Sequence, residues 1–423
     1  MTARQCAFSL LLKLKKSGAY SNILLDSQLK QSALSEQDKA FATALFYGVL
    51  EKQIFLDYQL CLVLKQPIKK LRDEVLIALR LGVYQLLLMD KVPQSAAINE
   101  SVKLVKKNRC AYAAGFVNAC LRSVQRNGVM LPEKTAENYE SVKYAMPQHL
   151  IDLWRADYGR ETCSALLESL SQKPKTVIRV NTLLTDIDAL ATELIQAGIC
   201  VEKDSRCEQA LVLEKTGAIA SLPAFKEGKF HVEDTAAQMA ALLLEAQAGE
   251  RVLDVCAAPG GKAFTIAEQM GSGKLLACDI YESRVSLIQK GAERLQIPFI
   301  QTLVQDACCF NSALGVFDRV FCDVPCSGLG IMRRKPEIRY KSIEEIEASS
   351  ALQLKILTTA FGYLKQGGRL VYSTCTLHKA ENEAVIEAYL KEHPAELLFQ
   401  KTYFPHIEHT DGFFAAVLKK NEQ

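Results

Sequence analysis

The feature that most constrains the fold of this chain is an apolar run that ends in a glycine turn, from Val252 to Lys262. Apolar residues at helical spacing resume at Phe264, so the stretch predicts a strand, a tight turn and the start of a helix. Proteins of the α/β class bind ligands over the helix N-terminus in this arrangement. Gly260 and Gly261 let the backbone come close to a ligand, because they lack a Cβ and can reach positive φ. The stretch therefore predicts a ligand-binding turn, with a plain strand-to-helix connection as the alternative.

Two well-known phosphate-binding turns do not match this stretch. A P-loop requires a glycine where this chain has Cys256, and a serine or threonine where it has Ala263. The glycine pattern of dinucleotide-binding proteins, G-x-G-x-x-G, is also absent from the turn. The turn is therefore predicted to hold a nucleotide-like ligand in a different way.

Four further apolar runs follow the turn, and acids or thiols stand where these runs end. The runs predict strands over Leu275–Asp279, Phe299–Val304, Phe317–Asp323 and Arg369–Ser373. Asp306 follows the second of them, Cys326 the third and Cys375 the fourth. Open α/β sheets bind ligands at the carboxyl ends of their strands, where an acid can accept hydrogen bonds from a ribose diol. The pattern predicts a doubly wound α/β sheet with a site at this edge.

Five motifs stand in order over roughly the last two hundred residues. They are Cys256 to Lys262, Asp279, Asp306, the Asp-Val-Pro-Cys turn that ends at Cys326, and Thr374-Cys375-Thr376. In this order they resemble the motifs of the Nol1/Nop2/Sun family, the S-adenosylmethionine-dependent RNA cytosine-C5 methyltransferases. The resemblance implies a Rossmann-like methyltransferase core of about seven strands. Its last hairpin is expected near residues 396–404 and 412–418.

The resemblance implies S-adenosylmethionine as the cofactor. The glycine turn would hold its methionine end, Asp279 its ribose and Asp306 its adenine amino group. Lys262 would either meet the cofactor carboxylate or tune Cys375. The implied cofactor-binding residues are Cys256, Ala257, Ala258, Pro259, Gly260, Gly261, Lys262, Asp279, Arg284, Asp306 and Asp323.

Methylation at carbon 5 of a cytosine requires a nucleophile that first adds to carbon 6, because carbon 5 alone does not attack a methyl sulfonium. A thiolate is suited to this covalent catalysis, and Cys326 and Cys375 both qualify. A Pro-Cys turn, which DNA cytosine methyltransferases use, nominates Cys326. The family resemblance nominates Cys375 and leaves Cys326 to assist release of the methylated product. It also implies a catalytic role for Asp323, as a hydrogen-bond partner of the N3 and N4 edge of the cytosine.

Basic residues close to the Pro-Cys turn are candidate contacts for substrate phosphates. They are Arg333, Arg334, Lys335 and Arg339. Arginine and lysine position a nucleic acid through its phosphates, without reading its sequence. We therefore expect them to lie at the surface beside the two thiols.

The first 130 residues are predicted to form helices only. Apolar residues recur at three-and-four spacing over residues 5–16, 20–33, 36–52, 54–65, 70–89, 95–107 and 111–126. Ser35 and Asp38 predict a capped helix start. Four motifs, Ala19–Asn22, Gln37–Phe41, Tyr47–Leu50 and Phe116–Ala119, resemble the helical RNA-binding fold of the antitermination factor NusB.

Charge is distributed unevenly along the chain. Residues 1–130 contain 19 lysines and arginines against 9 acids, whereas the remainder contains 32 against 39. A basic segment joined to an acidic one suggests a polyanion-binding module beside a catalytic module. Candidate phosphate contacts are Lys103, Lys106, Lys107 and Arg109 at one helix end, with Arg122 and Arg126 expected nearby.

A small α/β subdomain is predicted between these two parts. Residues 129–140 read as a linker, helices are expected near 147–157 and 160–170, and a β-α-β rhythm follows. Arg179–Thr182 resembles the family's pre-catalytic region, which has a fold like an RNA-recognition motif, and Asn181 is either structural or a substrate contact. We therefore predict three domains: residues 1–130, 145–228 and 229–423.

Composition narrows the class of protein further. The content of 49% hydrophobic and 23% charged residues is typical of soluble globular proteins. No membrane span, secretion signal or metal-ligand spacing is apparent, and the 14 cysteines read as reduced thiols. We therefore predict a cytoplasmic protein without a metal. The family resemblance of the two larger parts implies an enzyme that acts on one cytosine of 16S ribosomal RNA, free or in early assembly. The alternatives are the same chemistry on transfer RNA and a non-catalytic RNA-binding assembly factor.

Overall fold

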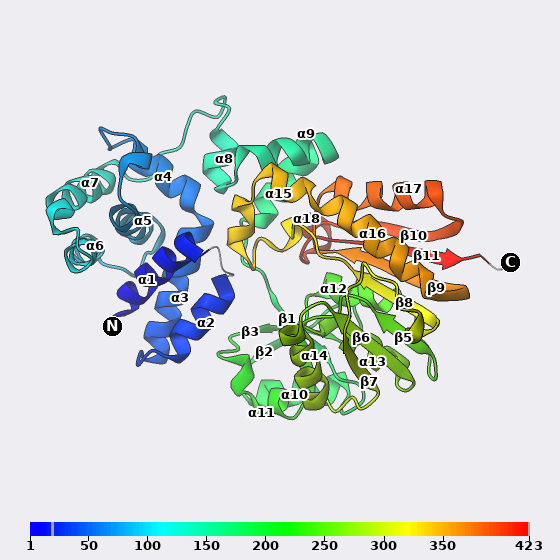
Figure 1. Cartoon of the computed structure of the whole chain (residues 1–423). Helices are drawn as coiled ribbons and strands as arrows, with labels where there is room; N and C mark the ends of the chain where they lie inside the picture. Colours follow the sequence, from blue (N-terminus) through cyan, green and yellow to red (C-terminus); the bar gives the residue numbers. More distant parts are fainter. Residues whose placement is uncertain (18–20, 422–423) are drawn as a thin grey trace. The chain divides into compact units, whose positions relative to one another are not determined.

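The computed structural model describes residues 1–17 and 21–421 (Figure 1). The beginning of the helix predicted over residues 20–33, and Ala19 and Tyr20 of the first NusB-like motif, lie outside the described residues. The chain divides into two compact units, which are treated separately below. The first comprises Met1–Cys163 and Arg334–Lys341, and the second comprises Ser164–Arg333 and Ser342–Gln423.

The first unit is helical, as its apolar spacing predicts. Its helices are α1 (Ala3–Ser17), α2 (Ser21–Lys30), α3 (Glu36–Glu51), α4 (Gln53–Cys61), α5 (Asp73–Leu88), α6 (Gln94–Lys107), α7 (Ala114–Asn127), α8 (Tyr139–Tyr144) and the first part of α9 (Gln148–Leu170), with 3-10 turns at η1 (Ile68–Lys70), η2 (Ala111–Ala113) and η6 (Pro336–Tyr340). Ser35 caps α3 by accepting from the amide of Asp38. Gly159, with φ of 82°, interrupts α9 where the sequence predicts a gap between two helices.

The segment Arg334–Lys341 belongs to the first unit although it follows the Pro-Cys turn by only a few residues. The Arg339 side chain is buried and donates to the backbone oxygens of Glu51 (2.8 Å) and Ala145 (3.2 Å). These oxygens belong to the last residue of α3 and the residue after α8, where helices leave carbonyls without intrahelical partners. A cation is favourable there, because the helix dipole places partial negative charge at the C-terminus. The prediction that Arg339 contacts substrate phosphates is therefore wrong.

Replacing Arg339 with alanine should destabilise the first unit by about 3 kcal/mol, because two buried carbonyls lose their donor. Urea unfolding of the full-length protein would measure this loss. Arg126→Ala is a matched control, since this side chain is exposed and donates to Ser123 within its own helix. Equal unfolding midpoints for Arg339→Ala and the wild type would contradict the structural role.

The second unit contains a small four-stranded antiparallel sheet. Its elements are the end of α9, β1 (Thr176–Val180), α10 (Ile187–Gln196), β2 (Cys200–Lys203), β3 (Ala210–Glu214), η3 (Ile219–Ser221), α11 (Pro223–Lys226) and β4 (Phe230–Val232). The strand order is β2-β3-β1-β4. The sequence predicts only β1 and β3, because β2 is short and mostly exposed and β4 has three residues. β4 also lies after residue 228, the predicted end of the subdomain.

The large sheet of the second unit has seven strands in the order β10-β11-β9-β8-β5-β6-β7. These strands are β5 (Arg251–Asp254), β6 (Lys274–Asp279), β7 (Ile300–Val304), β8 (Phe317–Asp323), β9 (Leu364–Thr374), β10 (Ala395–Tyr403) and β11 (Phe413–Lys420). Strands β9, β8, β5, β6 and β7 are parallel, and β10 and β11 form the predicted closing hairpin. The predicted doubly wound sheet is confirmed.

Helices cover both faces of this sheet (Figure 1). The remaining elements are α12 (Thr235–Leu242), α13 (Gly261–Met270), α14 (Glu282–Arg294), η4 (Ser312–Leu314), η5 (Leu329–Ile331), α15 (Ile343–Glu347), α16 (Ser349–Gly362), η7 (Lys379–Glu381), α17 (Glu383–Glu392) and α18 (Pro405–Glu408). Side chains of α16 and α17 form one core with the sheet, and those of α12, α13 and α14 form another. Asp234 caps α12 by accepting from the amide of Ala236. Neighbouring strand residues alternate between the two cores, as in parallel sheets buried on both sides.

Two expectations from composition can be compared with the structure. All 14 cysteines are free thiols. Within residues 1–17 and 21–421, every helix is too short or too polar to span a lipid bilayer.

Candidate functional site

The order of the strands sets the predicted site residues side by side along one edge of the large sheet. Cys375 directly follows β9, Asp323 ends β8 and Asp279 ends β6. Asp306 follows β7, the next strand along. The direction of winding reverses between β8 and β5, which is the switch point where doubly wound sheets bind their ligands. The predicted thiols and acids are thus gathered at one edge.

The glycine turn between β5 and α13 passes through a crowded space. A Cβ on Gly260 would lie 2.4 Å from the ring of Phe264, and φ of Gly260 is 117°. A Cβ on Gly261 would lie 2.8 Å from the carboxylate of Glu233. The peptide bond between Ala258 and Pro259 is cis. The positive φ of Gly260 therefore favours glycine there, and the bare turn leaves main-chain groups at the start of α13 available to a ligand.

Arg284 contacts both the glycine turn and Asp279 at the end of β6. Its guanidinium donates to the backbone oxygen of Ala258 at 2.9 Å and lies 3.4 Å from the Asp279 carboxylate. Asp279 also accepts from the amide of Tyr281 at 3.2 Å. Asp306 accepts from the amide of Cys308 at 2.8 Å. Arg284 thus connects the turn to the acid predicted to hold a ribose, which is an arrangement the sequence alone does not indicate.

The two predicted thiols meet at the ends of β8 and β9. The sulfur atoms of Cys326 and Cys375 are 3.3 Å apart. The loop after Cys326 also contacts the Cys375 backbone, since Gly330 donates to the Cys375 oxygen at 3.0 Å. A Cβ on Gly330 would lie 2.9 Å from that oxygen and 2.0 Å from the oxygen of Gly412. Only glycine allows the two thiol loops to approach this closely.

Lys262 and Asp323 form an ion pair beside the thiols. Their side chains are 2.8 Å apart, and Ser373 donates to Asp323 at 2.8 Å. Burial by itself would lower the pKa of Lys262, but the carboxylates of Asp323 and Glu233 raise it above its ordinary value. Cys375 is near enough to Lys262 to contribute to this rise in its pKa. Lys262 is therefore a permanent cation that favours a thiolate on Cys375.

Cys326 is in the opposite electrostatic situation. The hydrogen bond with Cys375 and burial raise the pKa of Cys326 well above its ordinary value. Because two thiolates at 3.3 Å repel each other, the pair carries one negative charge at most. Burial likewise raises the pKa of Cys278 and Cys322 in the sheet core. Of these thiols, Cys375 is the one placed to ionise.

Asp254, at the end of β5, is a buried acid to which the sequence analysis gives no role. One oxygen accepts from the amide of Cys256 at 3.3 Å, and the other has no hydrogen-bond partner among residues 1–17 and 21–421. Burial and the nearby Asp323 carboxylate raise the pKa of Asp254 to about 8. Burial and the Asp323 charge therefore favour the neutral, protonated form of this side chain. Its position at a strand end next to the glycine turn is the signal that could have identified it.

Replacing Asp254 with asparagine should flatten the dependence of stability on pH. An unfolded aspartate has a pKa of about 3.9, so between pH 4 and the folded pKa of about 8 the folded state binds more protons. The free energy of unfolding of the wild type should then fall as pH rises through this window. Melting temperatures at pH 6 and pH 8 would show a smaller fall for Asp254→Asn. An equal fall in both proteins would contradict the raised pKa, and exposed Asp188→Asn is the control.

A buried charge cluster joins the small sheet to the glycine turn. Arg179 of β1 pairs with Glu268 of α13 at 2.7 Å, and His231 of β4 lies 3.5 Å from both Glu233 and Glu268. Burial would lower the pKa of His231, but the two nearby carboxylates raise it to about 9. Thr265 of α13 also donates to Glu233, at 2.5 Å. The small-sheet subdomain thus contacts α13, the helix that begins at the glycine turn, through residues that are far from α13 in sequence.

Other predicted contacts have structural partners. Asn181 is buried and donates to the backbone oxygens of Gly228 (2.9 Å) and Leu295 (2.8 Å), so its role is structural. Arg333 is buried against Asp411, 3.1 Å away, and also donates to the Thr410 oxygen. Arg333 is therefore not a free phosphate contact. Arg334 and Lys335 belong to the segment of the first unit described above.

The basic residues of α6 and α7 do not form one cluster. Lys106, Lys107 and Arg109 are exposed at the C-terminal end of α6. A hydrogen bond of 2.6 Å joins Gln125 of α7 to Gln94 at the N-terminal end of α6. Arg126, next to Gln125, therefore lies about 20 Å along α6 from Lys107, at 1.5 Å per residue. The expectation that Arg126 lies near Lys106, Lys107 and Arg109 is therefore wrong.

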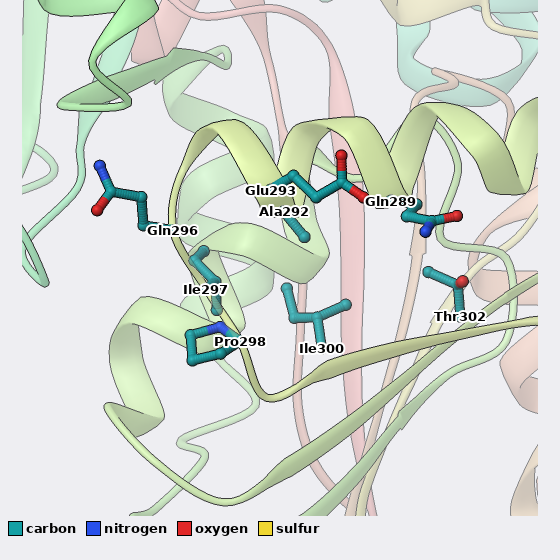
Figure 2. A pocket seen from close by; sticks show the side chains of 8 residues that line it. All are labelled: Gln289, Ala292, Glu293, Gln296, Ile297, Pro298, Ile300 and Thr302. Atoms are coloured by element: carbon teal, nitrogen blue, oxygen red, sulfur yellow. The ribbon is translucent and has the colours of Figure 1, made fainter.

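A hollow at the outer edge of the large sheet is separate from these residues. Figure 2 shows that side chains from the end of α14, the following loop and β7 line it. The lining residues are Gln289, Ala292, Glu293, Gln296, Ile297, Pro298, Ile300 and Thr302. They include none of the predicted site residues.

Comparisons with known families match the chain in three segments. The family model described as 16S rRNA methyltransferase RsmB/F matches residues 241–419. A NusB family model matches residues 1–126, and a ferredoxin-like domain described for RsmF/B-like methyltransferases matches residues 146–220.

Relatives and solved structures cover the chain as a whole. A Bacillus subtilis protein named "Probable ribosomal RNA small subunit methyltransferase B" is 35% identical, with 99% of each chain covered. The Vibrio cholerae protein named ribosomal RNA small subunit methyltransferase B is 32% identical, covering 99% of this chain and 98% of its own. The solved structure of PH0851 is 26% identical, with a TM-score of 0.84 and 99% of each chain covered. A methyltransferase homolog from Pyrococcus horikoshii is 25% identical, with a TM-score of 0.61, and covers 68% of this chain and 99% of its own.

Proposed function

Because this chain belongs to the RsmB/F family of 16S rRNA methyltransferases, we propose that it methylates carbon 5 of one cytosine in 16S ribosomal RNA. The observation that carries this proposal is the thiol pair, Cys326 and Cys375, 3.3 Å apart beside the Lys262–Asp323 ion pair. A thiol placed for ionisation and a second thiol held neutral next to it suit a reaction in which a covalent bond to carbon 6 is made and later broken.

The glycine turn and the strand ends fit S-adenosylmethionine as the methyl donor. Gly260 and Gly261 leave the backbone bare where the methionine end would lie, and Asp279 offers a carboxylate for the ribose. Asp306 would accept from the adenine amino group. When bound, the cofactor supplies an electrophilic methyl group on a sulfonium. Arg284 would act by holding the turn against Asp279.

Three residues of this chain would then act on the cytosine: Cys375, Asp323 and Cys326. The Cys375 thiolate forms a bond to carbon 6, and the electrons of the C5–C6 double bond attack the methyl group, whose bond to the sulfonium breaks. Asp323 is placed to hydrogen-bond the N3 and N4 edge, which withdraws charge from the ring. Loss of the C5 proton to a base then restores the double bond and expels the Cys375 thiolate. We assign Cys326 to this release step.

The RNA substrate is expected to be free or in early assembly, with the helical domain of residues 1–130 as the binding module. Its net positive charge and NusB resemblance support this assignment. The test uses labelled S-adenosylmethionine with unmethylated 16S RNA and, separately, transfer RNA. We expect label at carbon 5 of one cytosine in 16S RNA. Label only in transfer RNA would keep the chemistry and change the substrate, and no label in either would favour a non-catalytic assembly factor.

A further inference from the structure

Glu381 is a fully buried acid that has no part in the reaction described above. It ends the 3-10 turn η7, six residues after Cys375, and its side chain has no exposed surface. One carboxylate oxygen accepts from the amide of Ser327 (2.8 Å) and from the side-chain amide of Gln353 (2.9 Å). The other oxygen accepts from the Ser327 hydroxyl. A buried carboxylate is costly unless hydrogen bonds compensate it, and these three donors, which come from the Cys326 loop and α16, do so.

The same donors fix the loop on both sides of Cys326. Ser327 follows Cys326 directly, and Gln353 also donates to the backbone oxygen of Pro325, which precedes it, at 3.1 Å. Glu381 therefore binds Ser327, the residue after Cys326, directly. It binds Pro325, the residue before Cys326, indirectly through Gln353. Because both neighbours are fixed, the direction in which the Cys326 sulfur points depends on this carboxylate.

The network continues to the Cys375 loop. The hydroxyls of Ser327 and Thr376 are 2.6 Å apart, and Thr376 follows Cys375 directly. Asn382, next to Glu381, accepts from the Thr374 hydroxyl at 2.6 Å and donates to the Thr376 oxygen at 3.1 Å. The backbone oxygen of Glu381 is itself fixed by the Tyr372 hydroxyl at 2.7 Å. Glu381 thus lies where the loops of both thiols are joined.

The charge of Glu381 acts on the same thiol. Its negative charge adds to the hydrogen bond between Cys326 and Cys375 and to burial in raising the pKa of Cys326. A glutamine at this position would keep the size of the side chain, remove that charge and place a donor where the Ser327 hydroxyl now donates. The loop geometry and the protonation of Cys326 would then change together.

We propose that Glu381 is a positioning residue for product release, because it holds the Cys326 loop against the Cys375 loop. This role rests on the function proposed above. Loss of Glu381 should impair the second half of the reaction, in which the C6–S bond breaks, more than the first half, in which it forms. A merely structural residue would lower both together.

The experiment compares the full-length wild type, Glu381→Gln and Cys326→Ala, each with unmethylated 16S RNA and labelled S-adenosylmethionine. Denaturing gels measure the protein–RNA adduct, and steady-state assays measure kcat and KM. For Glu381→Gln we expect adduct to accumulate as in Cys326→Ala, and kcat to fall about tenfold or more while KM for the RNA changes about twofold at most. Cofactor affinity should stay close to that of the wild type.

Glu383→Gln is the matched control, because Glu383 is two residues away and its carboxylate accepts from Thr402 of β10. It should turn over without adduct. Ser327→Ala is a second probe that removes one hydroxyl from the network and should give a weaker form of the same effect, even if Glu381→Gln does not fold. Glu381→Asp, which keeps the charge, should recover part of kcat.

Adduct in Cys326→Ala but none in Glu381→Gln and Ser327→Ala would overturn the positioning role. A parallel loss of cofactor affinity, melting temperature and rate without adduct would overturn it as well. Absence of label with the wild-type protein would instead overturn the proposed function on which this role depends.

Discussion

Cys375→Ala is expected to abolish methyl transfer to 16S RNA, with a loss of at least about a thousandfold in rate. Without the thiolate, no bond to carbon 6 forms, and carbon 5 stays too weak a nucleophile to take a methyl group from a sulfonium. Transfer of labelled methyl to RNA would measure the rate, and denaturing gels should show no protein–RNA adduct. Affinity for the cofactor should be preserved, since the glycine turn after β5 and Asp279 at the end of β6 are not altered.

Cys200→Ala is the matched control for this prediction. Cys200 is an exposed thiol on β2 of the small sheet, so its removal should leave methyl transfer unchanged. Full activity of Cys375→Ala would show that another group attacks carbon 6. Cys326 would then be the first alternative, since its sulfur lies 3.3 Å from that of Cys375.

The choice between the two thiols depends on charges that sequence order does not reveal. The Lys262 ammonium interacts with Cys375, whereas Cys326 has a raised pKa next to Cys375 and Glu381. The sequence places both cysteines at strand ends but leaves the nucleophile to family resemblance. The three-dimensional arrangement adds an independent argument for the same assignment, because an ammonium favours a nearby thiolate.

The set of residues at the carboxyl ends of the large sheet's strands was predictable, because it depends on local sequence patterns. Each apolar run with an acid or thiol at its end marks one strand, and parallel strands must end at a common edge. This logic correctly brings Cys375, Asp323, Asp279 and Asp306 together. The hairpin of β10 and β11, which the family resemblance implies, lies within one or two residues of its expected position.

Contacts between distant segments were not predictable in the same way. Arg339 looks like a phosphate contact in sequence, because nothing local shows that the carbonyls of Glu51 and Ala145 will surround it. Glu381 and Glu233 look like ordinary surface acids for the same reason. Their roles come from side chains that are 30 residues or more away in the chain, such as Ser327 and Thr265. Short elements are missed for another reason: β4, for example, has too few residues to show the period of two that predicts a strand.

Cys326→Ala is expected to separate the two halves of the reaction. Cys375 can still add to carbon 6, and the methyl group can still be transferred. Release of the product then lacks the Cys326 thiol, which in the wild type lies 3.3 Å from the Cys375 sulfur. Turnover should stop after about one cycle, and a covalent protein–RNA adduct that resists denaturation should accumulate with labelled methyl in it. Single-turnover and steady-state assays on the same preparation would measure both effects.

The adduct should depend on the other thiol. The double variant with Cys326→Ala and Cys375→Ala should form none, because the bond to carbon 6 requires the Cys375 sulfur. If Cys326→Ala instead loses activity without adduct while Cys375→Ala stays active, the two roles are reversed. The neutral state of Cys326 argues against that reversal, because a thiol with a raised pKa is a poor nucleophile at pH 7 and a better partner for a leaving thiolate next to it.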